Sequence, residues 1–121
     1  MTKTAVEMKE RTKKFALRVI KMVRSLPKDF VAQAIGKQVL RSATSVGANY
    51  RAASRGRSPA EFRAKLGIVL EESDETAYWI ELVKDAGILP ATKLTSLLEE
   101  ANEITAMMIA SLNTSSRNNP S

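Results

Sequence analysis

Three short interruptions divide this sequence into four long stretches that suit helices. Prolines or glycines mark them near residues 26–29, 54–59 and 87–90, and no stretch between them shows the alternation typical of strands. Connections this short force consecutive helices to run antiparallel. The sequence therefore predicts an all-α fold, an antiparallel up-down-up-down four-helix bundle over residues 1–112.

Apolar residues recur with helical spacing in each stretch. We expect helices over residues 3–26, 29–53, 58–86 and 90–112. Ser58 is expected to cap the third helix, with the Glu61 side chain accepting a hydrogen bond from the backbone amide of Ser58 in return. Pro90 is expected to open the fourth helix, and the polar segment 113–121 to be disordered. The predicted buried faces include Phe15, Val19, Val31, Ile35, Val46, Leu66, Ile80, Leu98 and Ile104.

Two missing residue types exclude most chemistry. The chain has no cysteine and no histidine. It therefore lacks disulfides, cysteine-based metal sites and histidine, the residue that most often acts as a general base. A carboxylate run at 71–75 lacks the histidines of a di-iron bundle site. We expect no metal, no cofactor and no enzyme activity. The residues show neither a signal peptide nor a membrane span, which predicts a cytoplasmic protein without membrane contact.

Charge is distributed unevenly along the chain. Residues 1–57 carry 14 Lys/Arg and 3 Asp/Glu, net +11, whereas residues 58–121 carry 5 and 10, net −5. A basic half is typical of a protein that binds nucleic acid phosphates, RNA or DNA, but it could equally dock on an acidic protein surface. With no aromatic platform for stacking bases evident, we expect contacts to phosphates rather than sequence-specific reading. The expected phosphate contacts are Lys14, Arg18, Lys21, Lys37, Arg41, Arg51, Arg55 and Arg57.

Several apolar residues lie outside the four helix faces that are expected to form the core. On the third helix, a stripe with Trp79 lies nearly opposite the core stripe, and a lone bundle has nowhere to bury both. We therefore expect a homo-oligomer, in which opposite charges favour a heterologous contact that closes into a ring. The expected interface residues are Leu17, Ile20, Ile68, Tyr78, Trp79 and Leu82.

The segment 45–50, SVGANY, followed by Arg55, SPAEF at 58–62 and KLGI at 65–68, closely resembles one protein family. It is similar to the S23-like four-helix-bundle proteins encoded in intervening sequences of bacterial large-subunit ribosomal RNA genes. That resemblance covers about residues 26–89 and implies a cytoplasmic homo-oligomer, typically a pentamer. The family is also distantly similar to accessory proteins of diversity-generating retroelements, which bind a reverse transcriptase and nucleic acid.

The family motif is matched only in part. Many members read S-V-P-A-N-[IVL]-A-E-G, and here Ser45 and Asn49 match, while Gly47 replaces the proline and Ala52 the glutamate. Any role of the two replaced positions is therefore not carried over. For Ser45 and Asn49 we expect a structural role, because a polar residue beside an apolar helix face must be hydrogen-bonded.

Overall fold

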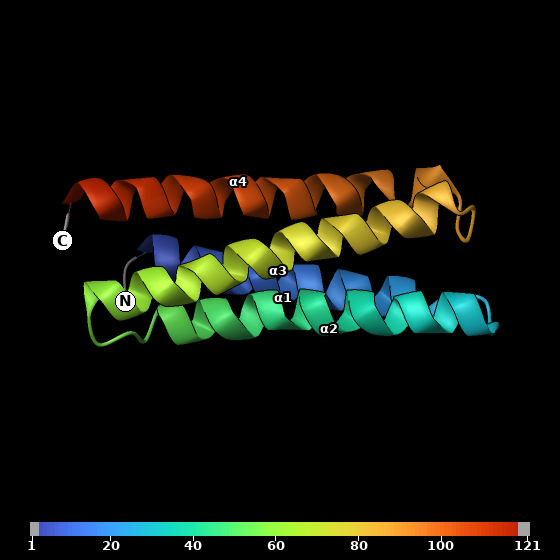
Figure 1. The fold of residues 1–121 in the computed structure, drawn as a ribbon, viewed down its shortest axis with the longest axis horizontal. Coiled ribbons are helices and arrows are strands. Elements are labelled where there is room, and N and C mark those ends of the chain that lie inside the picture. The colour runs from blue at the N-terminus through green and yellow to red at the C-terminus, as the bar shows by residue number, and fades with distance from the viewer. Residues whose placement is uncertain (1–2, 119–121) are drawn as a thin grey trace.

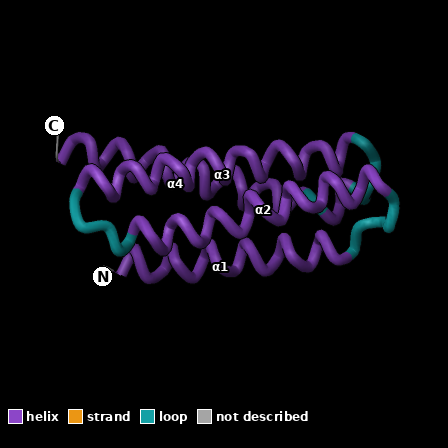
Figure 2. Tube along the Cα trace, turned by 60° about the horizontal axis from the view of Figure 1, so that its bottom comes forward, coloured by secondary structure: helices purple, strands orange, loops and turns teal. Residues whose placement is uncertain are grey.

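The computed structural model describes residues 3–118 and places them in long antiparallel helices (Figure 1). These are α1 (Lys3–Arg24), α2 (Phe30–Ala53), α3 (Pro59–Asp85) and α4 (Thr95–Asn118), with a 3-10 helix, η1 (Ala91–Lys93), before α4. Successive connections lie at alternate ends, and both chain ends lie together at one end (Figure 2). The predicted all-α up-down-up-down bundle is confirmed.

Helices that follow one another in the chain make most of the contacts. α2 packs most extensively on α3, α3 on α4 and α1 on α2, while the seam between α1 and α4 is the least extensive of the four. The basic helices α1 and α2 are thus adjacent, and the acidic helices α3 and α4 form the opposite side of the bundle.

Side-chain caps fix the start of two helices. The Asp29 carboxylate accepts a hydrogen bond from the Ala32 amide (2.9 Å), and the Ser58 hydroxyl accepts one from the Glu61 amide (3.1 Å). Pro59 occupies the first turn of α3, where its missing N–H costs nothing. The predicted Ser58 cap is confirmed, but among the described residues the Glu61 side chain makes no return bond to it.

A glycine ends α3. Gly87 has φ of 70°, and the Ile88 amide donates to the Val83 carbonyl (3.0 Å), which is the Schellman arrangement. Pro90 does not open α4 as predicted. It precedes η1 instead, and α4 begins only at Thr95.

The core is continuous along the bundle and includes every predicted core residue but one. Ile35 and Leu98 are partly buried against it, whereas Val31 is 55% exposed. Ala32 takes the core position instead, because about 100° per residue aligns it with Val39. Predicted residues that are fully buried are Phe15, Val19, Val46, Leu66, Ile80 and Ile104.

The predicted disordered tail is wrong for residues 113–118, because α4 continues to Asn118. Adding a residue to a formed helix costs little compared with starting one, and Ser, Thr and Asn are only moderately weak helix formers. The next strong helix breaker in the sequence is Pro120. Residues 119–121, the rest of the predicted tail, lie outside the described residues.

Candidate nucleic-acid interface

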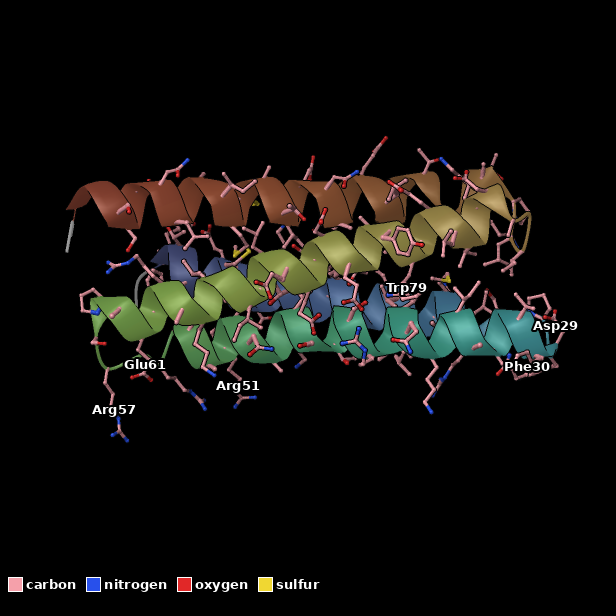
Figure 3. All side chains as sticks on the ribbon, viewed as in Figure 1. Asp29, Phe30, Arg51, Arg57, Glu61 and Trp79 are labelled. Atoms are coloured by element: carbon pink, nitrogen blue, oxygen red, sulfur yellow. The ribbon has the colours of Figure 1, made fainter. Side chains whose placement is uncertain are left out.

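Most of the expected phosphate contacts are exposed and available. The side chains of six of the eight make no hydrogen bond or ion pair within residues 3–118, and Figure 3 shows Arg51 and Arg57 projecting outward on the α2 side. Within residues 3–118, no carboxylate is ion-paired with them. These six are Lys14, Lys21, Lys37, Arg51, Arg55 and Arg57.

Arg41, a seventh, is engaged within the molecule. Its guanidinium forms ion pairs with Glu72 (3.3 Å) and Glu75 of α3 and donates to the Gln38 side chain of its own helix (3.2 Å). Glu75 also accepts a hydrogen bond from the Trp79 indole (3.0 Å). Arg41 thus joins α2 to α3, and two carboxylates offset its charge.

Arg18, the eighth, donates to the Ser96 hydroxyl of α4 (2.8 Å). Two turns earlier, Arg11 makes a bidentate pair with Glu100 through Nε and Nη2 (2.8 Å each) and a further contact from Nη2 to Glu103 (2.6 Å). The hydrogen bonds with Glu100 raise the pKa of Arg11, and the same bonds lower the pKa of Glu100. This face of α1 holds α4 in place.

A groove of about 440 Å³ runs between α1 and α2. Three cationic side chains line it, two of which, Lys9 and Lys13, were not among the expected contacts. Their i, i+4 spacing on a helix was a signal that could have identified them. We call Lys9, Lys13 and Arg51 the groove cations. The complete lining is Lys9, Glu10, Lys13, Ala16, Thr44, Gly47, Ala48 and Arg51.

Gly47 of α2 lies next to the α1 backbone at this groove. A Cβ atom at Gly47 would lie 3.6 Å from the Thr12 carbonyl oxygen, in ordinary contact with the α1 backbone. Small side chains of both helices line the groove, together with three cations and the carboxylate of Glu10. Such a surface suits an extended polyanion better than a compact ligand.

The expected cations do not form one patch. Lys14 and Lys21 follow Arg11 and Arg18 at helical spacing and lie on the α1 face turned toward α4. Lys37 and Arg51 lie on α2 instead, and Arg55 follows the end of that helix. The structure therefore places Lys9 and Lys13 of α1 across a groove from Arg51 of α2, and Arg55 and Arg57 follow the end of α2.

Ser45 and Asn49 bond to each other. The Asn49 amide donates to the Ser45 carbonyl (2.9 Å) and hydroxyl (2.8 Å) one turn earlier in α2, and both residues are half-buried. These bonds satisfy the Asn49 donor inside the helix, as the expected structural role requires.

The six expected interface residues fall into two groups. Leu17, Ile68 and Tyr78 are exposed, whereas Ile20, Trp79 and Leu82 are half-buried. The bundle itself covers part of Trp79, which packs against the core and donates an indole hydrogen bond to Glu75.

Sequence reasoning also missed an exposed aromatic residue. Phe30 is 87% exposed at the start of α2, at the end of the bundle away from Arg57 (Figure 3). Its i, i+7 spacing to Lys37 places it on the outer side of the helix and could have revealed this.

Two further features bear on function. Within residues 3–118, no group of three or more His, Cys, Asp or Glu side chains could hold a metal ion. In the same range, every helix is too short or too polar to cross a membrane.

The sequence and the fold both have known relatives. The family model for the 23S rRNA-intervening sequence protein matches residues 4–110. A crystal structure of a protein of unknown function from the S23 ribosomal protein family of Bacteroides thetaiotaomicron is 34% identical, with a TM-score of 0.79 over 86% of this chain and 96% of that chain. A search of curated protein sequences found no match. This chain belongs to the 23S rRNA-intervening sequence protein family.

Proposed function

We propose that this protein is a non-catalytic, homo-oligomeric nucleic-acid-binding protein of the cytoplasm that favours structured RNA. The observation that supports this most directly is the groove between α1 and α2, in which the groove cations have no carboxylate bonded to them. Arg55 and Arg57 continue the basic surface past the end of α2. RNA phosphates would release their counterions on binding there, so affinity depends on salt.

The intramolecular ion pairs distinguish cations that hold the helices together from cations that are free to contact phosphates. Arg11 and Arg41 bond carboxylates of α4 and α3, so a phosphate would have to compete with those partners. Unpartnered cations face no such competition. We therefore assign the main phosphate contacts to the groove cations, Arg55 and Arg57, and a structural role to Arg41.

Binding to a fluorescein-labelled RNA hairpin, measured by anisotropy over a salt series, tests this function. Replacing all three groove cations by Gln should reduce the slope of log affinity against log salt by about 2–3, since each lost phosphate contact removes about 0.7–0.9. The matched control is Arg41→Gln, which removes a charge from the same helix but should leave the slope unchanged.

Two results would contradict the function. Wild-type protein that does not bind the hairpin at low salt, or that binds it independently of salt, would favour the alternative function, a protein interaction scaffold whose charged faces serve assembly only. Equal slope losses in the triple variant and in Arg41→Gln would remove the distinction between groove and structural cations.

For the oligomer, we propose a ring, with five subunits as the family resemblance suggests. Support comes from exposed apolar side chains on both charged sides of the bundle, Leu17 on α1 and Tyr78 on α3. Their exposed fractions are 56% and 53%, and burying them between subunits would contribute about 1–2 kcal/mol each.

Light scattering tests the assembly. Leu17→Glu combined with Tyr78→Glu should reduce the particle mass toward that of a monomer and leave the circular dichroism spectrum unchanged. Ile109→Glu is the matched control, because Ile109 is exposed on α4 and was not among the expected interface residues. Wild-type protein that is monomeric at tens of micromolar would refute the proposal.

A further inference from the structure

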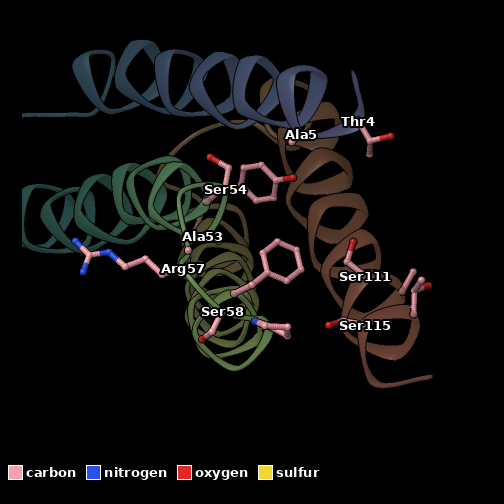
Figure 4. A pocket seen from close by; sticks show the side chains of 14 residues that line it. Thr4, Ala5, Ala53, Ser54, Arg57, Ser58, Ser111 and Ser115 are labelled. Atoms are coloured by element: carbon pink, nitrogen blue, oxygen red, sulfur yellow. The ribbon is translucent and has the colours of Figure 1, made fainter. Parts of the chain in front are cut away.

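A cavity of about 820 Å³ opens at the end of the bundle where both chain ends lie. Its walls come from the start of α1, the end of α2, the turn into α3 and the last turns of α4. Figure 4 shows Ser111 and Ser115 of α4 on one side of the hollow, across from Ser58 and Ala53. Its size is within the range of small-molecule sites.

The lining is apolar with many hydroxyl groups. Tyr50 and Phe62 supply aromatic rings from α2 and α3, and Pro59 and three alanines supply further apolar surface. Arg57 is the one charged residue of the lining, and in Figure 4 its side chain points away from the hollow. Such a cavity suits an uncharged, partly apolar group with hydrogen-bonding edges. The hydroxyl-bearing residues are Thr4, Tyr50, Ser54, Ser58, Ser111, Thr114 and Ser115.

Tyr50 has an unused hydrogen-bonding group in this cavity. The residue is 6% exposed, yet its hydroxyl bonds nothing in residues 3–118. In that range, every fully enclosed side-chain nitrogen or oxygen has a hydrogen-bond partner. Because the Tyr50 hydroxyl has no partner, it is not fully enclosed, and it opens to the cavity that Tyr50 lines. Burial raises the pKa of Tyr50, so at neutral pH the hydroxyl is protonated and can donate. Buried polar groups normally have a partner, and here a ligand can supply it.

The basic turn lies directly beside this cavity. Arg55 and Arg57 flank Gly56, and all three follow the end of α2 that contributes Tyr50 and Ala53 to the lining. A Cβ at Gly56 would lie 3.1 Å from the Ala53 carbonyl oxygen and 3.2 Å from the Phe62 amide nitrogen. The turn is therefore packed tightly against the start of α3, which keeps both arginines near the cavity.

We propose that the cavity receives one unstacked nucleobase of an RNA whose phosphates lie on the basic turn. The base would pack its faces against Phe62 and Pro59 and accept a hydrogen bond from the Tyr50 hydroxyl, while Arg55 and Arg57 contact the flanking phosphates. This inference rests on the proposed function and deepens it. It also replaces the expectation that the chain lacks an aromatic platform, because the fold brings together Tyr50 and Phe62, which are 12 residues apart in the sequence.

The test uses the full-length protein and two single-stranded RNAs that differ at one position. One carries 2-aminopurine, a fluorescent base, and the other an abasic site. The wild-type protein should bind the 2-aminopurine RNA roughly 5- to 100-fold more tightly than the abasic RNA, which is the range for loss of one stacked base. The fluorescence of the 2-aminopurine should rise on binding, because the base leaves its stacked neighbours, and millimolar 2-aminopurine riboside should compete for the cavity without any phosphate.

Three variants separate the cavity from the basic surface. Tyr50→Phe should lower affinity for the 2-aminopurine RNA roughly fivefold and leave affinity for the abasic RNA unchanged. Ser111→Leu, which fills the cavity from α4, should abolish the preference between the two RNAs. Arg57→Gln should weaken binding of both RNAs equally.

The outcomes distinguish the two proposals. If wild-type protein binds both RNAs equally and neither Tyr50→Phe nor Ser111→Leu changes that, the cavity does not hold a base, and the charge-based function stands. If neither of these RNAs nor the riboside binds at low salt, the base site is refuted, and binding to the labelled hairpin alone decides the charge-based function. If the riboside alone binds, the cavity takes a free ligand, and its role in RNA binding is refuted.

Discussion

Replacing Arg11 by Met should destabilise the bundle more than removing any exposed cation of α1. Arg11 bonds Glu100 at two points and Glu103 at a third, across the seam between the first and last helices. Met retains most of the apolar stem of Arg, so the change removes chiefly the charged, planar head. It leaves Glu100 with no cation bonded to it.

The magnitude follows from the burial of the two side chains. Arg11 is 35% exposed and Glu100 16% exposed, between a surface pair worth about 0–1 kcal/mol and a buried pair whose breaking costs about 3–5 kcal/mol. We expect Arg11→Met to lower the free energy of unfolding by about 2 kcal/mol. For a domain of this length that corresponds to a fall in Tm of roughly 6–10 °C.

Urea denaturation followed by circular dichroism measures this cost, with Lys14→Met as the matched control. Lys14 lies one turn along the same helix, is exposed and has no partner in residues 3–118, so its replacement should change stability by less than about 0.5 kcal/mol. Equal effects of the two substitutions would show that the Arg11 pair contributes nothing, and the assignment would be wrong.

The ion pair between Arg11 and Glu100 makes the stability of the bundle depend on pH. The hydrogen bonds from Arg11 lower the pKa of Glu100 in the folded protein below its value of about 4.3 in the unfolded chain. The stabilisation is therefore complete above that pH and is lost as the pH falls through the lowered folded pKa. In acid, the free energy of unfolding of wild type should approach that of Arg11→Met. A difference in this free energy that stays constant from neutral pH to about pH 3 would contradict the role of Glu100 ionisation.

Three further predictions concern the rest of the bundle. Gly67→Ala should raise the free energy of unfolding by about 0.5–1 kcal/mol in thermal melts, because the added Cβ would meet nothing within 4 Å inside α3; a loss of stability would reveal an unseen contact there. Thr76→Val should lower it by about 1 kcal/mol, since the buried Thr76 hydroxyl donates to the Ser42 hydroxyl (2.8 Å), and an unchanged urea midpoint would argue against that bond. Exhaustive chelation should leave Tm unchanged, because the chain has neither histidine nor cysteine; a large shift would indicate a structural metal.

Features that depend on neighbouring residues in the chain could be predicted. The Ser58 cap and the turn at Gly87 each require only a few consecutive residues to satisfy backbone groups. Helix number and order follow from the same local signals. The end of α4 was harder to predict, because polar residues such as Asn113 neither stop a formed helix nor extend it strongly.

The candidate site depended on how helices align, which residue spacing within one helix does not determine. Arg41 and Arg51 are ten residues apart on the outside of α2, and Arg41 bonds α3 whereas Arg51 lines the groove with α1. The register between α2 and α3 places Glu72 within reach of Arg41 but not of Arg51. Trp79 likewise lies off the core stripe of α3 but is partly covered in the folded bundle.

The order in which helices pack has a consequence for folding kinetics. Within residues 3–118, each extensive interface joins helices adjacent in the chain, and the seam between α1 and α4, which are distant in the sequence, is much less extensive. Most contacts thus close only short loops, and folds of such low contact order reach the native state in microseconds to milliseconds. The final seam needs the longest loop closure and offers little packing in return. We expect α1 to dock against α4 after the transition state, so that Arg11→Met speeds unfolding while the refolding rate stays close to that of wild type.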